Sequence, residues 1–195
     1  MEITASMVKE LRSQSGAGII EWKSALKETS GDIDAAITFL RKKGLAKADK
    51  KSDRQTGDGA IGSYIHAGNK LGVMVELNCE TDFVANTPDF QELVRDIAMH
   101  IAAAKHRFAK REEVTQEILN KEKEIFAHQA KESGKPDNII EKIVSGKMEK
   151  FYEENCILEQ PFIKDTDITV QELIKQKIAL LGENINIGRF VRFEV

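Results

Sequence analysis

The chain has 195 residues, 41% of them hydrophobic and 31% charged, which is enough for one medium domain with a small appended module. Its net charge of -3 argues against a protein that binds nucleic acid by charge alone, because phosphate neutralisation requires an excess of Lys and Arg. The sequence contains no apolar run of roughly 18 residues, no secretion signal at its N-terminus and no CxxC motif, so we expect a cytoplasmic protein that does not span a membrane.

Three short helices are predicted in the first 46 residues. The first precedes a glycine-rich turn at residues 16–18, and the second ends near Gly31. The third begins after Asp32, which can cap it, and is expected to end at Gly44. A bundle of this size has a small core and marginal stability, which is typical of a recognition module rather than an enzyme domain.

A basic and hydrophilic stretch follows the third helix. Residues 41–54 contain seven basic side chains and two acidic ones. We interpret residues 47–58 as a linker between a module at 1–46 and a core at 59–195. The alternative is a patch that binds RNA or an acidic partner. Because no aromatic residue is interleaved for stacking on bases, the pattern favours the linker.

From residue 60 onward the hydrophobic period changes from that of a helix to that of a strand. Residues 61–66 and 71–79 flank a short turn and predict a β-hairpin, and residues 184–195 predict a third strand. In the second strand every other residue is apolar, which predicts a sheet with one covered face and one face open to solvent or a partner. In the third strand the residues predicted to share one face are Val191, Phe193 and Val195.

Four further helices are predicted in the core. A long one starts after Thr87 and Pro88 and is expected to cover the sheet, because its apolar residues form a continuous stripe. Charged helices at about 115–132 and 136–153 predict a helical hairpin, and a last helix runs from Thr169 to Gly182. The predicted class is α+β: a three-helix module, then an antiparallel three-stranded sheet packed with helices and a helical hairpin.

No motif of a known catalytic class is present. The sequence lacks a phosphate-binding loop, a dinucleotide fingerprint, HExxH and GxSxG. A metal hydrolase built on His66, Cys79, Asp82 and His100 was considered, but their spacing follows no ligand pattern, and cysteines of this kind are usually small buried residues. We therefore expect no catalytic residue, no metal and no cofactor.

The segment Thr81–Asn86 is the least easily explained as structure alone. It lies between a predicted strand and a capped helix, so we expect a short exposed connection that carries Phe83 beside Asp82. Phe83 could pack under the start of the following helix as a hydrophobic staple. Composition alone favours this staple, and the alternative is that Phe83 is presented to a pocket on a partner as an anchor.

The segment Thr81–Asn86 is one of several motifs that extend from residues 11–18 to residues 192–195. Together these motifs resemble the bacterial elongation factor Ts family, the guanine nucleotide exchange factors for elongation factor Tu. The resemblance covers essentially the whole chain and is closest to short members with a single core lobe. The family's usual Thr and Asp-Cys are replaced here by Ser15 and Glu21-Trp22, which affects only packing in the first module. The motifs are residues 11–18, 23–26, 62–66, 81–86, 100–103, 160–162, 182–187 and 192–195.

The resemblance implies a function in protein synthesis without bond-making chemistry. Such a factor binds Tu–GDP, weakens its magnesium and phosphate contacts and promotes release of GDP so that GTP can bind. Such a factor would affect GDP and GTP only indirectly, through Tu. The resemblance also implies a homodimer, because short members pair to rebuild a two-lobed surface. It implies neither nucleic-acid nor membrane binding.

Site residues follow from the same resemblance. The N-terminal module resembles the ubiquitin-associated fold, docks on the nucleotide-binding domain of Tu and places Lys23 at a contact position. Phe83 is expected to enter an apolar pocket there, and Asp82 to disturb contacts of the magnesium and its water. The positions assigned to the magnesium-displacing turn are Thr81, Asp82, Phe83, Val84, Ala85 and Asn86, and further Tu contacts are assigned to His66, Leu181 and Gly182.

A different class of function is an adaptor that binds RNA or a ubiquitin-like protein. It would use the three-helix module and the basic stretch at residues 41–54. Salt-sensitive binding to RNA would identify it, and the negative net charge of the chain argues against that outcome.

Overall fold

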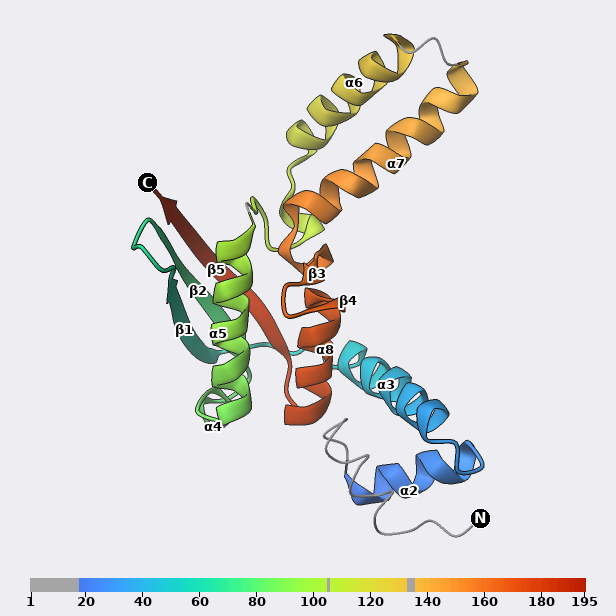
Figure 1. Ribbon diagram of the computed structural model, residues 1–195, viewed down its shortest axis with the longest axis vertical. Helices are drawn as coiled ribbons and strands as arrows, with labels where there is room; N and C mark the ends of the chain where they lie inside the picture. The colour runs from blue at the N-terminus through green and yellow to red at the C-terminus, as the bar shows by residue number, and fades with distance from the viewer. Residues whose placement is uncertain (1–17, 105, 133–135) are drawn as a thin grey trace. The chain divides into compact units, whose positions relative to one another are not determined.

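The computed structural model describes residues 18–104, 106–132 and 136–195 (Figure 1). The chain forms two compact units, each assembled from three segments. Unit 1 comprises the residues up to 60, 77–93 and 172–186, and unit 2 comprises 61–76, 94–171 and 187–195. The predicted first helix of the N-terminal module lies outside the described residues.

Two helices, α2 (Ile19–Glu28) and α3 (Ile33–Asp49), form a hairpin in unit 1. The chain reverses at Gly31, whose φ of +85° is accessible to glycine. Asp32 caps α3 as predicted, since its Oδ1 accepts a hydrogen bond from the backbone N–H of Ala35 at 2.9 Å. The two helices share a buried core of Trp22, Ala25, Leu26, Ala36 and Leu40.

The predicted end of the third helix at Gly44 is wrong, because α3 continues through this residue to Asp49. Gly44 lies where α3 packs on α8 (Val170–Leu181), and a Cβ at this position would be 3.4 Å from the Cβ of Ala179. Gly44 therefore lies within a helix–helix contact, which a Cβ would meet at ordinary van der Waals distance, and it does not end the helix. The ion pairs Arg41–Glu172 at 3.3 Å and Asp49–Lys175 at 2.6 Å join the same two helices.

Three strands form the antiparallel sheet that the sequence predicts: β1 (Asp58–Ile65), β2 (Leu71–Cys79) and β5 (Ile185–Glu194), in the order β1-β2-β5. In the hairpin, the N–H of His66 donates to the carbonyl of Leu71 at 2.9 Å. The N–H of Val195 donates to the carbonyl of Lys70, also at 2.9 Å, so β5 ends beside the start of β2. The predicted hairpin and third strand are confirmed.

The long helix α5 (Pro88–Ala103) begins after Thr87, whose Oγ1 accepts from the N–H of Phe90 at 3.2 Å. Figure 1 shows α5 running along the sheet, and in unit 2 it approaches β1 so closely that a Cβ on Gly62 would lie 2.3 Å from Val94 Cγ1. The predicted apolar stripe is confirmed, because all of its members are buried: Phe90, Leu93, Val94, Ile97, Ala98, Ile101 and Ala102.

The opposite face of the sheet in unit 2 carries exposed apolar side chains, and we call it the open sheet face. Arg189 and Glu76 form an ion pair on it at 2.9 Å. Arg192 of β5 points to the face covered by α5, where it bonds the carbonyl of Ala102, so its neighbours Val191 and Phe193 lie on the open sheet face, and Phe193 is 67% exposed. The exposed apolar residues of the open sheet face are Ile61, Ile65, Met74, Val191, Phe193 and Val195.

The predicted helical hairpin is also present, formed by α6 (Gln116–Glu132) and α7 (Asp137–Asn155). Short 3-10 turns, η1 (Arg111–Glu113) and η2 (Ile157–Glu159), lie at its base. A two-stranded antiparallel sheet, β3 (Pro161–Phe162) with β4 (Asp165–Thr169), was not predicted. The α+β class is thus confirmed. Among the helices in the described ranges, none is both long and apolar enough to cross a bilayer.

Candidate functional site

The predicted exposed connection after β2 is a single short helix, α4 (Asp82–Ala85). Thr81 is extended and caps it, because its Oγ1 accepts from the N–H of Val84 at 3.4 Å. At the other end the side-chain amide of Asn86 donates to the carbonyl of Asp82 at 2.9 Å. The side chains of Thr81 and Asn86, at the two ends of the segment, therefore both stabilise this single turn of helix.

Phe83 is 82% exposed, so the interpretation as a buried staple is wrong. Residues two apart on a helix point in different directions, and here it is Ala85 that turns inward, with 5% exposure. The aromatic ring buried near the start of α5 is Phe90 instead. Asp82 is exposed beside Phe83, so α4 presents one large apolar and one acidic side chain together.

Glu183, which is distant in the sequence but also belongs to unit 1, holds Thr81 in place. Its carboxylate accepts from the backbone N–H of Thr81 at 3.0 Å and from the hydroxyl of Thr81 at 2.7 Å. The buried Cys79 thiol donates to the carbonyl of Thr81 at 3.1 Å, and burial raises the pKa of this thiol, which keeps it protonated. Glu183 is not among the residues predicted from the sequence, where its only signal is its place in the 182–187 motif.

Leu181 and Gly182, two other predicted site residues, lie at the end of α8 directly before Glu183. Gly182 has a φ of +83°, which ends the helix as predicted, and its carbonyl accepts a hydrogen bond from Lys51. The buried Asn184 donates its side-chain amide to the carbonyls of Ser52 and Arg54, at 3.1 and 2.8 Å. The chain that follows α3 is thus bound to the same edge of unit 1 as α4.

Lys23 is exposed on α2, between the buried residues Trp22 and Ala25. Ile19 and Ile20 precede it by four and three residues, so they lie on the same surface of the helix. Ile19 is 49% and Ile20 84% exposed. This surface of α2 is therefore apolar with one adjacent positive charge.

His66 is the one predicted site residue in unit 2; the others belong to unit 1. It is exposed just after β1, and its Nδ1 lies 3.1 Å from the hydroxyl of Tyr64. A second histidine considered in the sequence, His100, is 3% exposed, and its Nδ1 accepts from the N–H of Ile163 at 3.3 Å. His100 is thus a core histidine with a backbone partner.

Comparison with known proteins identifies relatives along the full length of the chain. The family model described as Elongation factor TS matches residues 4–195. The chain belongs to the elongation factor Ts family. Elongation factor Ts of Thermosipho melanesiensis is 57% identical over 193 residues, covering 99% of this chain and 98% of the relative. For the factors of Solibacter usitatus and Fervidobacterium nodosum, the identities are 58% and 56%, covering 100% of this chain and 92% and 99% of the relatives.

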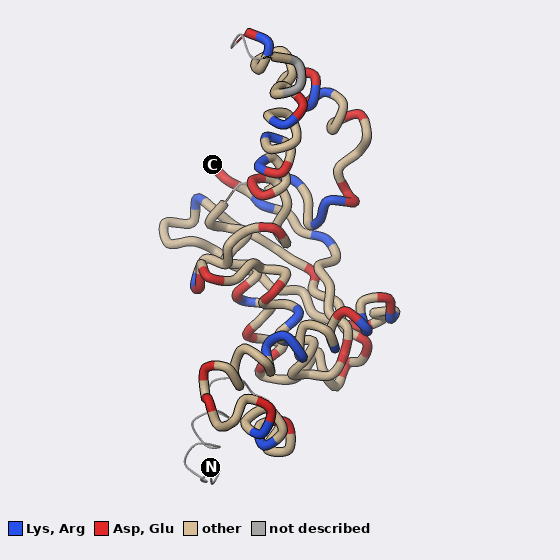
Figure 2. Tube along the Cα trace, turned by 90° about the vertical axis from the view of Figure 1, so that its right-hand side faces the viewer, with Lys and Arg blue, Asp and Glu red and all other residues tan. Residues whose placement is uncertain are grey.

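The basic stretch of this chain, residues 41–54, forms contacts within unit 1. Arg41 pairs with Glu172, Lys47 with Glu21, and Arg54 with Glu80, while Lys51 bonds to the carbonyl of Gly182. Figure 2 shows acidic and basic residues interleaved along the chain rather than separated by sign. These contacts count against a basic patch that tracks a nucleic-acid backbone. Within the described ranges, no three His, Cys, Asp or Glu side chains are grouped so that they could hold a metal ion.

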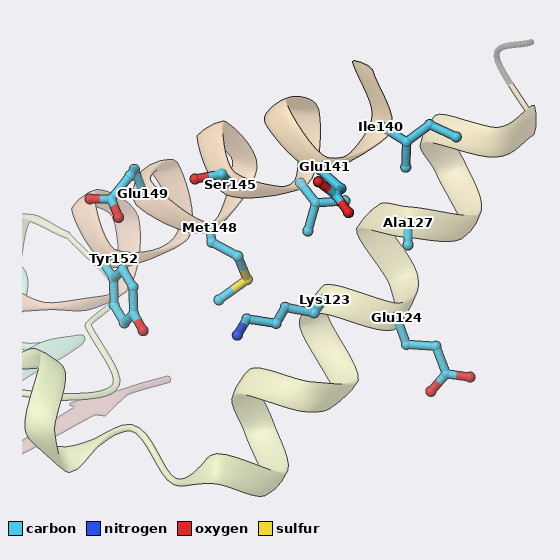
Figure 3. A pocket seen from close by; sticks show the side chains of 10 residues that line it. Lys123, Glu124, Ala127, Ile140, Glu141, Ser145, Met148, Glu149 and Tyr152 are labelled. Carbon is cyan, nitrogen blue, oxygen red and sulfur yellow. The ribbon is translucent and has the colours of Figure 1, made fainter. Parts of the chain in front are cut away.

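A groove of about 640 Å³ lies along the α6–α7 hairpin of this family member (Figure 3). Lys123, Glu124 and Ala127 of α6 line one side, and Met148 and Tyr152 of α7 lie on the other. The site residues predicted from the sequence do not line it. The groove and the Thr81–Asn86 segment are separate features.

Proposed function

We propose that this chain is a guanine nucleotide exchange factor for elongation factor Tu, with no bond-making step of its own. The observation that carries the proposal is the exposure of Phe83 and Asp82 on a capped, anchored turn in a member of the elongation factor Ts family. An exposed Phe is unfavourable in water unless a partner covers it, and burying one contributes roughly 1.5–3 kcal/mol. That free energy is available to a contact with a pocket.

The mechanism is a coupling between two binding events. Phe83 enters an apolar pocket of Tu near the phosphate site, and the carboxylate of Asp82 disturbs the contacts of magnesium and its water. The chain thereby favours a conformation of Tu that holds GDP poorly. GTP then binds to Tu because it is present in excess. Both nucleotides bind to Tu, and this chain affects them only indirectly.

The remaining Tu contacts extend the docking surface. Lys23, beside exposed Ile19 and Ile20 on α2, belongs to a ubiquitin-associated-like module that docks on the nucleotide-binding domain. His66, Leu181 and Gly182 contribute further contacts from the core. We assign docking to residues 1–46, a connecting role to 47–58, and exchange and dimerisation to 59–195.

The chain pairs as a homodimer in the cytoplasm, through its open sheet face. Apolar side chains from three strands gather there, and Phe193 is 67% exposed. A charge at this position opposes pairing, so Phe193→Glu should be monomeric in light scattering at concentrations where the parental chain is dimeric. Ile125→Glu, at a 40% exposed position on α6, is the matched control and should remain dimeric. A parental chain that is monomeric at every concentration would contradict the dimer.

The decisive experiment measures release of a fluorescent GDP analogue from purified Tu, chased with unlabelled nucleotide. The parental chain should accelerate release at substoichiometric amounts. Phe83→Ala and Asp82→Ala should each slow the stimulated release at least about tenfold, which corresponds to about 1.4 kcal/mol, with unchanged thermal unfolding because both side chains are exposed. Binding to Tu without acceleration would contradict the exchange function and favour an adaptor. Parental rates in both variants would contradict the role of α4.

A further inference from the structure

The helix α4 has only four residues, too few to hold its own conformation. Helix nucleation is unfavourable, and isolated helices shorter than about 12 residues are marginal in water. Inside α4 the N–H of Ala85 reaches the carbonyl of Thr81 at 3.2 Å, and that of Asn86 reaches Asp82 at 3.0 Å. The position of Phe83 must therefore be fixed by groups outside α4.

Glu183 is the group best placed to do so. Its two carboxylate oxygens take both donors of Thr81, the backbone N–H at 3.0 Å and the hydroxyl at 2.7 Å. The same hydroxyl oxygen caps α4 by accepting from Val84. Hydrogen bonds to a charged carboxylate are stronger than neutral ones, and this pair fixes both the backbone and the χ1 rotamer of Thr81.

The backbone that carries Glu183 is itself held on both sides. Before it, the carbonyl of Gly182 accepts from Lys51. After it, the N–H of Asn184 donates to Glu80 at 2.7 Å, and the buried Asn184 amide bonds the carbonyls that follow α3. Glu183 therefore projects from a fixed backbone toward Thr81.

We propose that Glu183 is a positioning residue: it acts through Thr81 to hold α4 in the orientation that presents Phe83 and Asp82. Its function is separate from docking, because it determines how α4 is presented to a partner rather than contacting that partner. Only the link to nucleotide exchange rests on the proposed function. The ordering of α4 can be measured in the chain alone.

The test compares the full chain carrying Glu183→Ala with a Glu92→Ala control. Glu92 is also a carboxylate of unit 1, and Lys177, which it contacts at 3.4 Å, keeps its bond to Asp89 when Glu92 is removed. In the chain alone, hydrogen exchange at the amides of α4 should be about tenfold to hundredfold faster in Glu183→Ala than in the control, as expected for loss of bonds to a charged group. The rest of unit 1 should keep its protection.

A second pair of variants separates positioning from general stability. Glu183→Gln keeps one oxygen acceptor and should show an intermediate effect. Thr81→Val keeps the side-chain size but removes the hydroxyl, and with it both the bond to Glu183 and the cap on Val84. The double variant with Glu183→Ala should therefore show less than the sum of the two single effects, because both single variants already lack the bond between the hydroxyl and the carboxylate. Additive effects in the double variant would overturn the proposal. So would α4 protection in Glu183→Ala equal to the control, or protection lost evenly across unit 1.

The final measurement is GDP release from Tu at saturating chain concentration. The maximal stimulated rate should fall about tenfold in Glu183→Ala, while the concentration for half-maximal effect changes less than about threefold, because the docking surfaces are retained. A change confined to the half-maximal concentration would overturn a positioning role. If even the parental chain failed to accelerate release, the proposed function would fail, whereas the hydrogen-exchange result would still decide whether Glu183 orders α4.

Discussion

At the scale of single residues, the direction in which a side chain points decides whether it can contact a partner, and its chemical type alone does not. Phe83 and Ala85 are both apolar and two positions apart, yet one is 82% and the other 5% exposed. The sequence predicted that Phe83 mattered but not which way it pointed, because composition is the same for a staple and an anchor. Its exposure depends on a turn of helix that Glu183, 102 positions beyond Thr81, holds in place.

His106 provides a prediction of pH dependence at this scale. Its ring stacks on His100 with centroids 5.3 Å apart, and burial, with lesser effects of His100 and Arg192, lowers the pKa of His106 to about 4. The unfolded chain binds a proton at this side chain below about pH 6.5, whereas the folded chain does so only below about 4. The free energy of unfolding should therefore fall as the pH falls through this window, by about 2–3 kcal/mol.

The measurement is urea unfolding at about pH 7 and about pH 5, for the parental chain and His106→Gln. Carboxylates titrate in both proteins, so the difference between them reports on His106 and its contact with His100. The variant should lose less stability on acidification than the parental chain. Equal losses would show that His106 is protonated as readily in the folded as in the unfolded chain.

At the scale of elements, Arg111 connects the base of the helical hairpin. It pairs with Glu149 of α7 at 2.8 Å and with both oxygens of Glu159, and its guanidinium lies 4.4 Å from the ring centre of Tyr152. These carboxylates raise the pKa of Arg111. Arg111→Ala should lower the free energy of unfolding by about 1–2 kcal/mol, and Arg111→Lys should recover less than half, because ammonium lacks the planar fork.

Denaturant unfolding would check this, with Lys150→Ala as the matched control. Lys150 forms an exposed pair with Glu154 at 3.7 Å on the same helix, and its loss should change stability by less than about 0.5 kcal/mol. A smaller effect for Arg111→Ala than for Lys150→Ala would contradict the role of Arg111 at the hairpin base.

An element could be predicted from the sequence when the residues that define it lie within the element itself. The helix α5 carries its own cap and apolar stripe, and the β1–β2 hairpin carries its own turn, so local patterns sufficed. Gly44 was misread because its role depends on Ala179, far along the chain. The strands β3 and β4 have two and five residues, too few for a periodic pattern. The segment Thr81–Asn86 could be singled out from the sequence itself, whereas its role and the other site residues came from family resemblance and the anchoring contact of Glu183 required the fold.

At the scale of the whole molecule, the proposed exchange reaction makes a reciprocal prediction. If the chain weakens the affinity of Tu for GDP by some factor, GDP must weaken the affinity of Tu for the chain by the same factor. Calorimetric titration of the chain into nucleotide-free Tu and into Tu–GDP should therefore give a ratio of affinities equal to the ratio of GDP affinities with and without the chain. A ratio of one would contradict the exchange mechanism, because the chain would then leave the affinity of Tu for GDP unchanged.

The two units are interleaved along the chain, and this has a consequence for synthesis. Unit 1 needs residues 77–93 and 172–186 as well as the N-terminal segment, so it is complete only once the chain has been synthesised to residue 186. On the ribosome, Thr81 emerges about a hundred residues before Glu183, which at 5–20 residues per second is a delay of roughly 5 to 20 seconds. During this interval the nascent chain has the exposed Phe83 but not the contact that orders α4. Chains truncated before residue 183 should therefore lack an ordered α4.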